Sequence, residues 1–222
     1  MERPPITPQL RRTRVMAILR SSGARGLPAV AHALADAGVT CLEVTLTTPG
    51  ALDALARIRD HLGAEVAVGA GTVLTTGQAR DALSAGAGFL VSPVVDAELI
   101  RSAAKSGTPC YPGAWTPTEV YAAWQAGAAA VKLFPAGTGG TAHVRQLRAP
   151  LPQVPLMAVG GVDITRARDY IDAGACAVGI GSPLLRGVDG DSDSAALGAL
   201  TERARALLEA VGAGATAAGA GR

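Results

Sequence analysis

The sequence predicts an α/β protein folded as a single-domain (β/α)8 TIM barrel that spans residues 1–222. The main observation is that eight short apolar runs alternate with longer amphipathic stretches, at intervals of about 20 to 26 residues that suit this fold. The runs lack regular polar alternation, which is typical of parallel strands buried on both faces. Apolar residues make up 49% of the chain but aromatic residues only 3%, which indicates a core of small aliphatic side chains.

The expected strands and helices follow one another along the chain. The predicted strands are Val15–Leu19, Cys41–Leu46, Val66–Gly71, Phe89–Pro93, Pro109–Pro112, Ala130–Pro135, Leu156–Gly161 and Ala177–Ser182. The helix-like segments between them include Leu27–Ala37, Ala51–His61, Gly77–Ala85 and Ile164–Ala173. Residues 1–13 are expected to be an N-terminal lead-in, and residues 212–222, which are rich in glycine and alanine, a flexible tail.

Several helix boundaries carry local signals. Glycine follows an expected helix at Gly38, Gly86, Gly127 and Gly174. Because glycine readily adopts the left-handed conformation, each of these residues can end a helix and turn the chain into the next strand. Thr116 and Pro117 mark the start of another helix. An open doubly wound sheet is the alternative fold, but the Gly-x-Gly-x-x-Gly turn that usually follows its first strand is missing from residues 17–26.

The composition argues against several classes of function. The formal net charge is +2, and the densest basic patch, Arg11, Arg12 and Arg14, has no interleaved aromatic residue. We therefore expect a solvated segment there and no nucleic-acid binding. No apolar run reaches the roughly 20 residues that span a bilayer, and the polar N-terminus does not resemble a signal peptide. The three cysteines are widely spaced and the three histidines lack metal-ligand spacing, which indicates a cytoplasmic protein with reduced thiols and no metal site.

Lysine is rare, so the position of each lysine is informative. Only two of the 20 basic residues are lysines. Lys105 is expected at the exposed end of a helix, whereas Lys132 interrupts the predicted strand Ala130–Pro135. Desolvation there lowers the pKa of the amine, and a neutral amine can attack a ketone to form a Schiff base. Lys132 is therefore the candidate covalent catalytic residue; the alternative is a structural pair with a core carboxylate, which stabilises a protein poorly.

Glu43 is the matching carboxylate, because it interrupts the apolar strand Cys41–Leu46 while nearly every other acidic residue lies in an expected helix or loop. Inside a barrel and beside an amine, it can move protons during carbinolamine formation, dehydration and cleavage of the carbon skeleton. The alternative role, an ion-pair partner for Lys132, places both groups in the same pocket.

Glycines and hydroxyl groups follow the late strands. Gly160-Gly161 and Gly181-Ser182 end the seventh and eighth strands, where barrels commonly bind phosphate with backbone N–H groups and a short helix N-terminus. Glycine alone also marks tight turns, so the pairing of two such motifs is what favours an anionic ligand. Arg20, just beyond the first strand, can bind a carboxylate or a phosphate bidentately, although a surface arginine fits the same position.

Together these segments resemble the 2-dehydro-3-deoxy-phosphogluconate aldolase / 4-hydroxy-2-oxoglutarate aldolase family. The resembling stretches, in family order, are Met16–Arg20, Leu42–Leu46, Val68–Val73, Val91–Pro93, Pro112-Gly113 with Thr116–Glu119, Val131–Ala136, Gly160–Val162 and Gly179–Ser182. The resemblance implies a class I aldolase that needs no metal or other cofactor, on a barrel that associates as a homotrimer.

The resemblance also implies roles for individual residues. Lys132 matches the Schiff-base lysine of the family, and Glu43 matches its proton-shuttling glutamate. The implied substrate-binding positions are Arg20, Thr47, Thr72, Pro93, Phe134, Gly160, Gly161, Gly181 and Ser182. Thr47 stands where many members have an arginine for the substrate carboxylate, and Arg20, which occurs in members without that arginine, can supply the charge instead. Val159 replaces a threonine, as it does in the related phosphogalactonate aldolases.

The predicted reaction is the cleavage of a small 2-oxo acid, 2-dehydro-3-deoxy-6-phosphogluconate, to pyruvate and glyceraldehyde 3-phosphate, with 4-hydroxy-2-oxoglutarate as a further substrate. The galactonate epimer is the alternative substrate. Two alternatives belong to other classes of function. A phosphosugar isomerase or synthase needs no lysine inside the sixth strand, and a non-catalytic phosphate sensor would tolerate the loss of the Lys132 amine.

Overall fold

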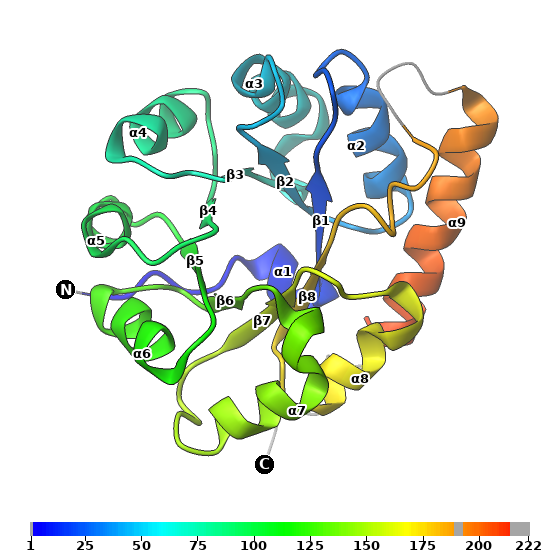
Figure 1. Cartoon of the computed structure of the whole chain (residues 1–222). Coiled ribbons are helices and arrows are strands. Elements are labelled where there is room, and N and C mark those ends of the chain that lie inside the picture. Colours follow the sequence, from blue (N-terminus) through cyan, green and yellow to red (C-terminus); the bar gives the residue numbers. More distant parts are fainter. Residues whose placement is uncertain (1, 189–192, 214–222) are drawn as a thin grey trace.

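The computed structural model of the chain describes residues 2–188 and 193–213. Parallel strands form a closed barrel, in which each strand pairs with the next and β8 pairs with β1 (Figure 1). The strands are β1 (Val15–Leu19), β2 (Cys41–Thr45), β3 (Ala67–Gly71), β4 (Leu90–Ser92), β5 (Cys110–Ala114), β6 (Val131–Leu133), β7 (Leu156–Val159) and β8 (Ala177–Ile180). The predicted single-domain (β/α)8 fold is confirmed.

Helices surround the barrel (Figure 1). They are α1 (Pro8–Thr13), α2 (Leu27–Asp36), α3 (Ala51–Leu62), α4 (Thr76–Ser84), α5 (Ala97–Lys105), α6 (Pro117–Ala126), α7 (Ala136–Arg148), α8 (Ala167–Asp172) and α9 (Ser194–Val211), with short 3₁₀ helices η1 (Gly63–Glu65) and η2 (Ile164–Arg166). Gly140 interrupts α7, because its φ of 61° and ψ of −163° are not helical. The last helix, α9, packs against α2 and α8.

The boundary signals in the sequence act as expected. Each of the four glycines predicted to end a helix has a φ between 93° and 108°, in the left-handed region that other residues avoid. Thr116 and Glu119 form a reciprocal capping box at the start of α6. β7 is shorter than predicted and ends at Val159, because Gly160 and Gly161 adopt left-handed φ values of 84° and 72° and leave the strand.

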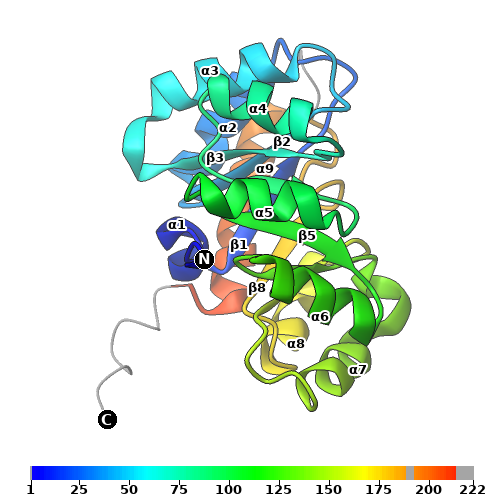
Figure 2. The ribbon, with the colours of Figure 1, turned by 90° about the vertical axis from the view of Figure 1, so that its left-hand side faces the viewer.

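The N-terminal segment closes the barrel at the end where the strands begin (Figure 2). Leu10 of α1 is fully buried and belongs to the apolar cluster inside the barrel. The backbone N–H of Thr7 donates a hydrogen bond of 3.0 Å to the hydroxyl of Tyr111 in β5. Residues 2–13 are therefore part of the fold rather than only a solvated lead-in, although Arg11 and Arg12 are exposed as expected.

The C-terminal end of the described chain is helical. Gly212 ends α9 in a left-handed conformation, with a φ of 71°. The predicted tail beyond Ala213 lies outside the described residues. Within the described ranges, no helix combines the length and the apolar character that a membrane crossing requires.

Candidate active site

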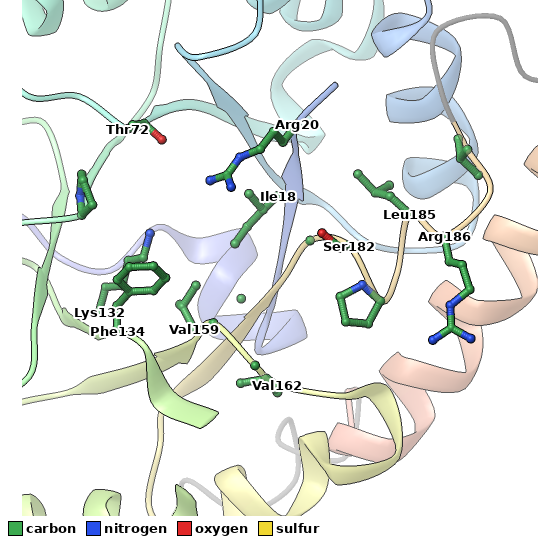
Figure 3. Close-up of a pocket in the computed structure, with 17 residues that line it drawn as sticks. Ile18, Arg20, Thr72, Lys132, Phe134, Val159, Val162, Ser182, Leu185 and Arg186 are labelled. Atoms are coloured by element: carbon green, nitrogen blue, oxygen red, sulfur yellow. The ribbon is translucent and has the colours of Figure 1, made fainter. Parts of the chain in front are cut away.

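A cavity of about 800 Å³ opens at the C-terminal ends of the strands (Figure 3). In (β/α)8 barrels this end carries the active site, because the loops that follow the strands converge there. Lys132 lines the cavity. So do all but one of the predicted substrate-binding residues, namely Arg20, Thr72, Pro93, Phe134, Gly160, Gly161, Gly181 and Ser182.

Lys132 lies in β6 and is only 6% exposed. Its strand neighbours in register are Gly113 and Met157, so the flanking strands bring no carboxylate to its side at this level. None of the ion pairs among the described residues involves Lys132. Burial lowers the pKa of the Lys132 amine; the Glu43 carboxylate opposes this shift and the Arg20 guanidinium adds to it. The amine is therefore easier to deprotonate than an ordinary lysine.

Glu43 lies in β2 and is only 1% exposed. Its Oε2 atom is buried without a hydrogen-bond partner, and its side chain packs directly over Gly71 of β3. Burial raises the pKa of the Glu43 carboxyl group, and the charges of Lys132 and Arg20 oppose the shift. A carboxylate with a raised pKa and a free oxygen can accept a proton more readily than a solvated one.

Arg20 and Thr72 follow β1 and β3 and line the cavity together with Lys132. Figure 3 shows the Arg20 guanidinium directed toward Lys132 and Thr72. Thr72 has a φ of 59°, a left-handed conformation that is rare for a β-branched residue. Strained residues of this kind persist where the surrounding structure holds them, often at functional sites. Arg20 and Thr72 thus provide a guanidinium and a hydroxyl group near the amine.

Phe134 follows β6, and the Lys132 Nζ atom lies 4.9 Å from the centre of its ring. The ring is 38% exposed, because it borders the cavity. A Cβ atom at Gly160 would lie 2.8 Å from two carbons of the ring. Gly160 therefore gives the backbone its left-handed turn and also leaves the space that the ring occupies.

The loop after β7 presents backbone groups to the cavity beside Phe134. Gly160 and Gly161 both line the cavity with left-handed φ values. The Gly137 N–H donates a hydrogen bond of 2.8 Å to the Gly160 carbonyl oxygen, and a Cβ atom at Gly161 would lie 3.1 Å from the Gly137 Cα. The loop after β7 and the start of α7 thus fix each other, and neither glycine accepts a side chain without strain.

The loop after β8 also borders the cavity. Gly181 and Ser182 line it, and the N–H groups of Leu184 and Leu185 both donate to the Gly181 carbonyl oxygen at 3.0 Å. These residues form a hydrogen-bonded turn, not the short helix that many barrels have after the eighth strand. Arg186 also lines the cavity, and in Figure 3 its guanidinium is directed away from Lys132. The sequence does not single out Arg186, whose only signal is its place six residues after β8.

Thr47 is the predicted binding residue that the structure does not bring into the cavity. It is exposed, lies two residues beyond β2, and its hydroxyl donates a hydrogen bond of 3.3 Å to the Thr45 hydroxyl. Of the two residues considered for the substrate carboxylate, only Arg20 lines the cavity.

The fold and the cavity define a (β/α)8-barrel enzyme in which the buried Lys132 lines the cavity, whereas Glu43 is buried in the middle of β2 and is not among the residues of the cavity lining. The profile of the KDPG and KHG aldolase family matches residues 6–196. The chain therefore belongs to this family of lyases, in which KDPG denotes 2-dehydro-3-deoxy-phosphogluconate and KHG 4-hydroxy-2-oxoglutarate.

Individual relatives carry the names of both epimeric substrates. The chain is 37% identical over 187 residues to the probable 2-dehydro-3-deoxy-6-phosphogalactonate aldolase of Rhizobium meliloti, an alignment that covers 84% of this chain and 87% of that protein. It is also 37% identical over 163 residues to the 2-dehydro-3-deoxy-phosphogluconate aldolase of Treponema pallidum, covering 73% and 77%. A solved structure described as native KDPGal superposes with a TM-score of 0.82 at 33% identity, covering 95% of this chain and 97% of that chain.

Proposed function

We propose that this protein is a class I aldolase that cleaves a phosphorylated 2-oxo-3-deoxy sugar acid through a Schiff base on Lys132. One observation carries the proposal: an amine only 6% exposed, without an ion-pair partner among the described residues, lines the cavity at the active-site end of the barrel. Its lowered pKa increases the share of neutral amine, which is the nucleophile that attacks a ketone.

The side chains present account for each step of the cleavage. The Lys132 amine adds to C2 of the 2-oxo acid. The carbinolamine takes up a proton from solvent, which Glu43 can relay, and loses water to give a protonated imine. Glu43 takes the proton of the C4 hydroxyl group, directly or through a water molecule, as the C3–C4 bond breaks. The bonding electrons move into the imine, which gives an enamine and releases glyceraldehyde 3-phosphate. Glu43 then gives this proton to the enamine carbon, C3, and hydrolysis of the resulting imine releases pyruvate and a proton and restores Lys132.

The two sides of the cavity suit the two anionic ends of such a substrate. Arg20 binds the carboxylate, because its guanidinium is directed toward the amine that must reach C2 (Figure 3). The backbone N–H groups of Gly160 and Gly161 and the Ser182 hydroxyl bind the phosphate, as do the corresponding loops of many barrels. The substrate is thereby aligned with C2 beside Lys132.

The proposed substrate is 2-dehydro-3-deoxy-6-phosphogluconate, with 4-hydroxy-2-oxoglutarate as a further substrate. A second candidate is the galactonate epimer. Val159, which lines the cavity, supports this epimer, as does the name of the Rhizobium meliloti relative. Pyruvate release from the three compounds, measured side by side, distinguishes them.

The proposal includes a homotrimer in the cytoplasm. Two exposed apolar side chains, Leu74 (46%) and Val94 (47%), lie on the loops after β3 and β4. The Val73 N–H donates a hydrogen bond to the Val91 carbonyl oxygen and ties the loop after β3 to strand β4. Such a patch suits contact with another copy of the chain. Light scattering should then give three times the chain mass of 22.2 kDa, and a monomer mass would contradict the trimer. Buried thiols at Cys41 and Cys110 suit a reducing compartment.

Borohydride reduction in the presence of pyruvate tests the covalent step. It should trap one adduct per chain at Lys132, located by peptide mass spectrometry, and Lys105 serves as the internal control. Lys132→Arg should be folded but inactive, because a guanidinium that stays protonated cannot form the imine. A phosphosugar isomerase or synthase gives no adduct, and a phosphate sensor keeps its ligand affinity when the amine is removed. A label on Lys105, or none, would therefore refute the proposal.

A further inference from the structure

Strand β3 presents no side chain to the barrel interior at two successive inward positions. Gly69 and Gly71 are two residues apart and therefore face the same side of the strand. Side chains from both neighbours occupy the space: the ring of Phe89, next to β4, lies over Gly69, and the side chain of Glu43 in β2 lies over Gly71. The carboxylate of Glu43 thus crosses β3 at a point that only glycine leaves open.

The fit between Glu43 and Gly71 is close. A Cβ atom at Gly71 would overlap the Oε1 and Cδ atoms of Glu43 and lie 2.5 Å from its Cγ, whereas real Cβ contacts essentially never fall below 3.0 Å. Gly71 is not among the residues with positive φ, so its backbone conformation is open to other amino acids. Glycine is required here for space and not for backbone conformation.

Polar contacts do little to hold the Glu43 carboxylate. Its Oε2 atom has no hydrogen-bond partner, and no ion pair within residues 2–188 and 193–213 involves Glu43. A buried side chain with few polar contacts takes its position from the shape of the surrounding packing. Displacement of a reacting group by about 1 Å can cost on the order of 10²-fold in rate, so the shape of this space matters for proton transfer.

We propose that Gly71 is a positioning residue for Glu43, because the space that Gly71 leaves by having no side chain holds the Glu43 carboxylate near Lys132. The inference rests on the proposed function of Glu43 in proton transfer. Gly71→Ala should displace the carboxylate while leaving Lys132 and the cavity lining in place.

Pyruvate alone separates the two relevant steps in the full-length protein. Borohydride trapping reports the imine on Lys132, and exchange of the pyruvate methyl protons for deuterium, followed by NMR, reports proton transfer at C3. Gly71→Ala should still give the trapped adduct at the end point. Its exchange rate should fall by a factor on the order of 10² to 10⁴, the loss expected when a general base is removed. Exchange at the wild-type rate in Gly71→Ala would overturn the proposal.

A double-mutant cycle with Glu43→Ala distinguishes positioning from a general loss of structure. Glu43→Ala removes the atoms that the new methyl group would meet. Adding Gly71→Ala to it should therefore lower neither the exchange rate nor the melting temperature further. If Gly71→Ala alone does not fold, recovery of folding in the double variant supports the proposal, and continued failure overturns it.

Gly69→Ala is the matched control on the same strand. Its methyl group meets the Phe89 ring, so it should lower the melting temperature while exchange per folded molecule stays close to that of the wild type. Equal loss of exchange in both glycine variants would assign the effect to distortion of β3 and overturn the proposal. Failure to label Lys132 in the wild type would instead refute the proposed function, and the melting temperatures of the cycle would still report the steric relation between Gly71 and Glu43.

Discussion

Replacing Phe134 by leucine tests whether the aromatic ring stabilises the charged intermediate. The Lys132 nitrogen lies 4.9 Å from the ring centre, within the range of a cation–π interaction. The imine proposed at this nitrogen carries a positive charge, whereas the attacking amine and the ketone are neutral. Phe134→Leu keeps an apolar side chain at the cavity edge but removes the ring, so it should destabilise the charged imine relative to the neutral reactants.

The size of the effect follows from the exposure of the two groups. Cation–π interactions contribute about 0.5–1 kcal/mol at exposed sites and about 2 kcal/mol when the cation is desolvated. Lys132 is 6% exposed and Phe134 is 38% exposed, which places this pair between the two limits, at about 1–2 kcal/mol. At 1.36 kcal/mol for each factor of ten, the expected loss in kcat/KM is about 5- to 30-fold.

If the ring acts on the charge, the loss of kcat/KM in Phe134→Leu should depend on pH. Above the pKa of Lys132, the free amine is neutral and the variant shows the full loss. Below that pKa the free enzyme is also cationic, so the ring stabilises both states and the loss shrinks. Measuring kcat/KM across pH, together with borohydride trapping at subsaturating pyruvate, tests this dependence. Phe89→Leu, which changes an aromatic residue in the core, should show no such trend. An unchanged kcat/KM in Phe134→Leu, or a loss that is the same at every pH, would refute the reasoning.

Three further predictions concern the proton-transfer group and the anion sites. Glu43→Gln keeps the shape of the side chain but removes the base, so kcat should fall by a factor on the order of 10² to 10⁴ with little change in KM. Arg20→Ala should raise KM for phosphorylated and plain 2-oxo acids alike. Ser182→Asp, which adds a negative charge beside the proposed phosphate site, should raise KM only for phosphorylated ones. The reverse pattern would assign the phosphate to Arg20 and the carboxylate to the loop of Ser182. The wild-type kcat/KM should decline toward acid at a pH above the ordinary glutamic acid pKa of about 4.3, because the raised pKa of Glu43 moves protonation of the base to higher pH. The lowered pKa of Lys132 acts in the opposite sense, because it keeps the amine neutral to a lower pH than in an ordinary lysine.

The strands and the barrel were predictable because burial on both faces leaves a simple signal of short aliphatic runs. The ends of the strands and helices were less predictable. The sixth strand was expected over Ala130–Pro135 but pairs only over Val131–Leu133, since apolar character continues into the loop that lines the cavity. Helix α1 gave no signal, because its six residues hold a single apolar side chain, Leu10, and its burial depends on contacts with distant strands.

Lys132 and Glu43 could be singled out as candidates from the sequence because a charged residue inside an apolar strand is unusual, and the structure places both side chains in buried strands. Loop residues carry no such contrast. The position of Thr47 in the sequence did not reveal that it lies outside the cavity lining, and Arg186 was one exposed arginine among many. The need for glycine at position 71 could not be read from the sequence either, because it depends on the Glu43 side chain of the neighbouring strand.

The shifted pKa values of the two central residues arise from the same packing that stabilises the barrel. One apolar cluster includes Leu10 of α1 together with Ile18 and Val159, which line the cavity. Because this cluster fills the barrel interior between α1 and the cavity, Glu43 and Lys132 lose hydration, which raises the pKa of the acid and lowers that of the amine. Water or polar side chains in that space would return both pKa values toward their ordinary range. Helix α1 therefore contributes to the reactivity of a cavity that it does not touch, by closing the opposite end of the barrel.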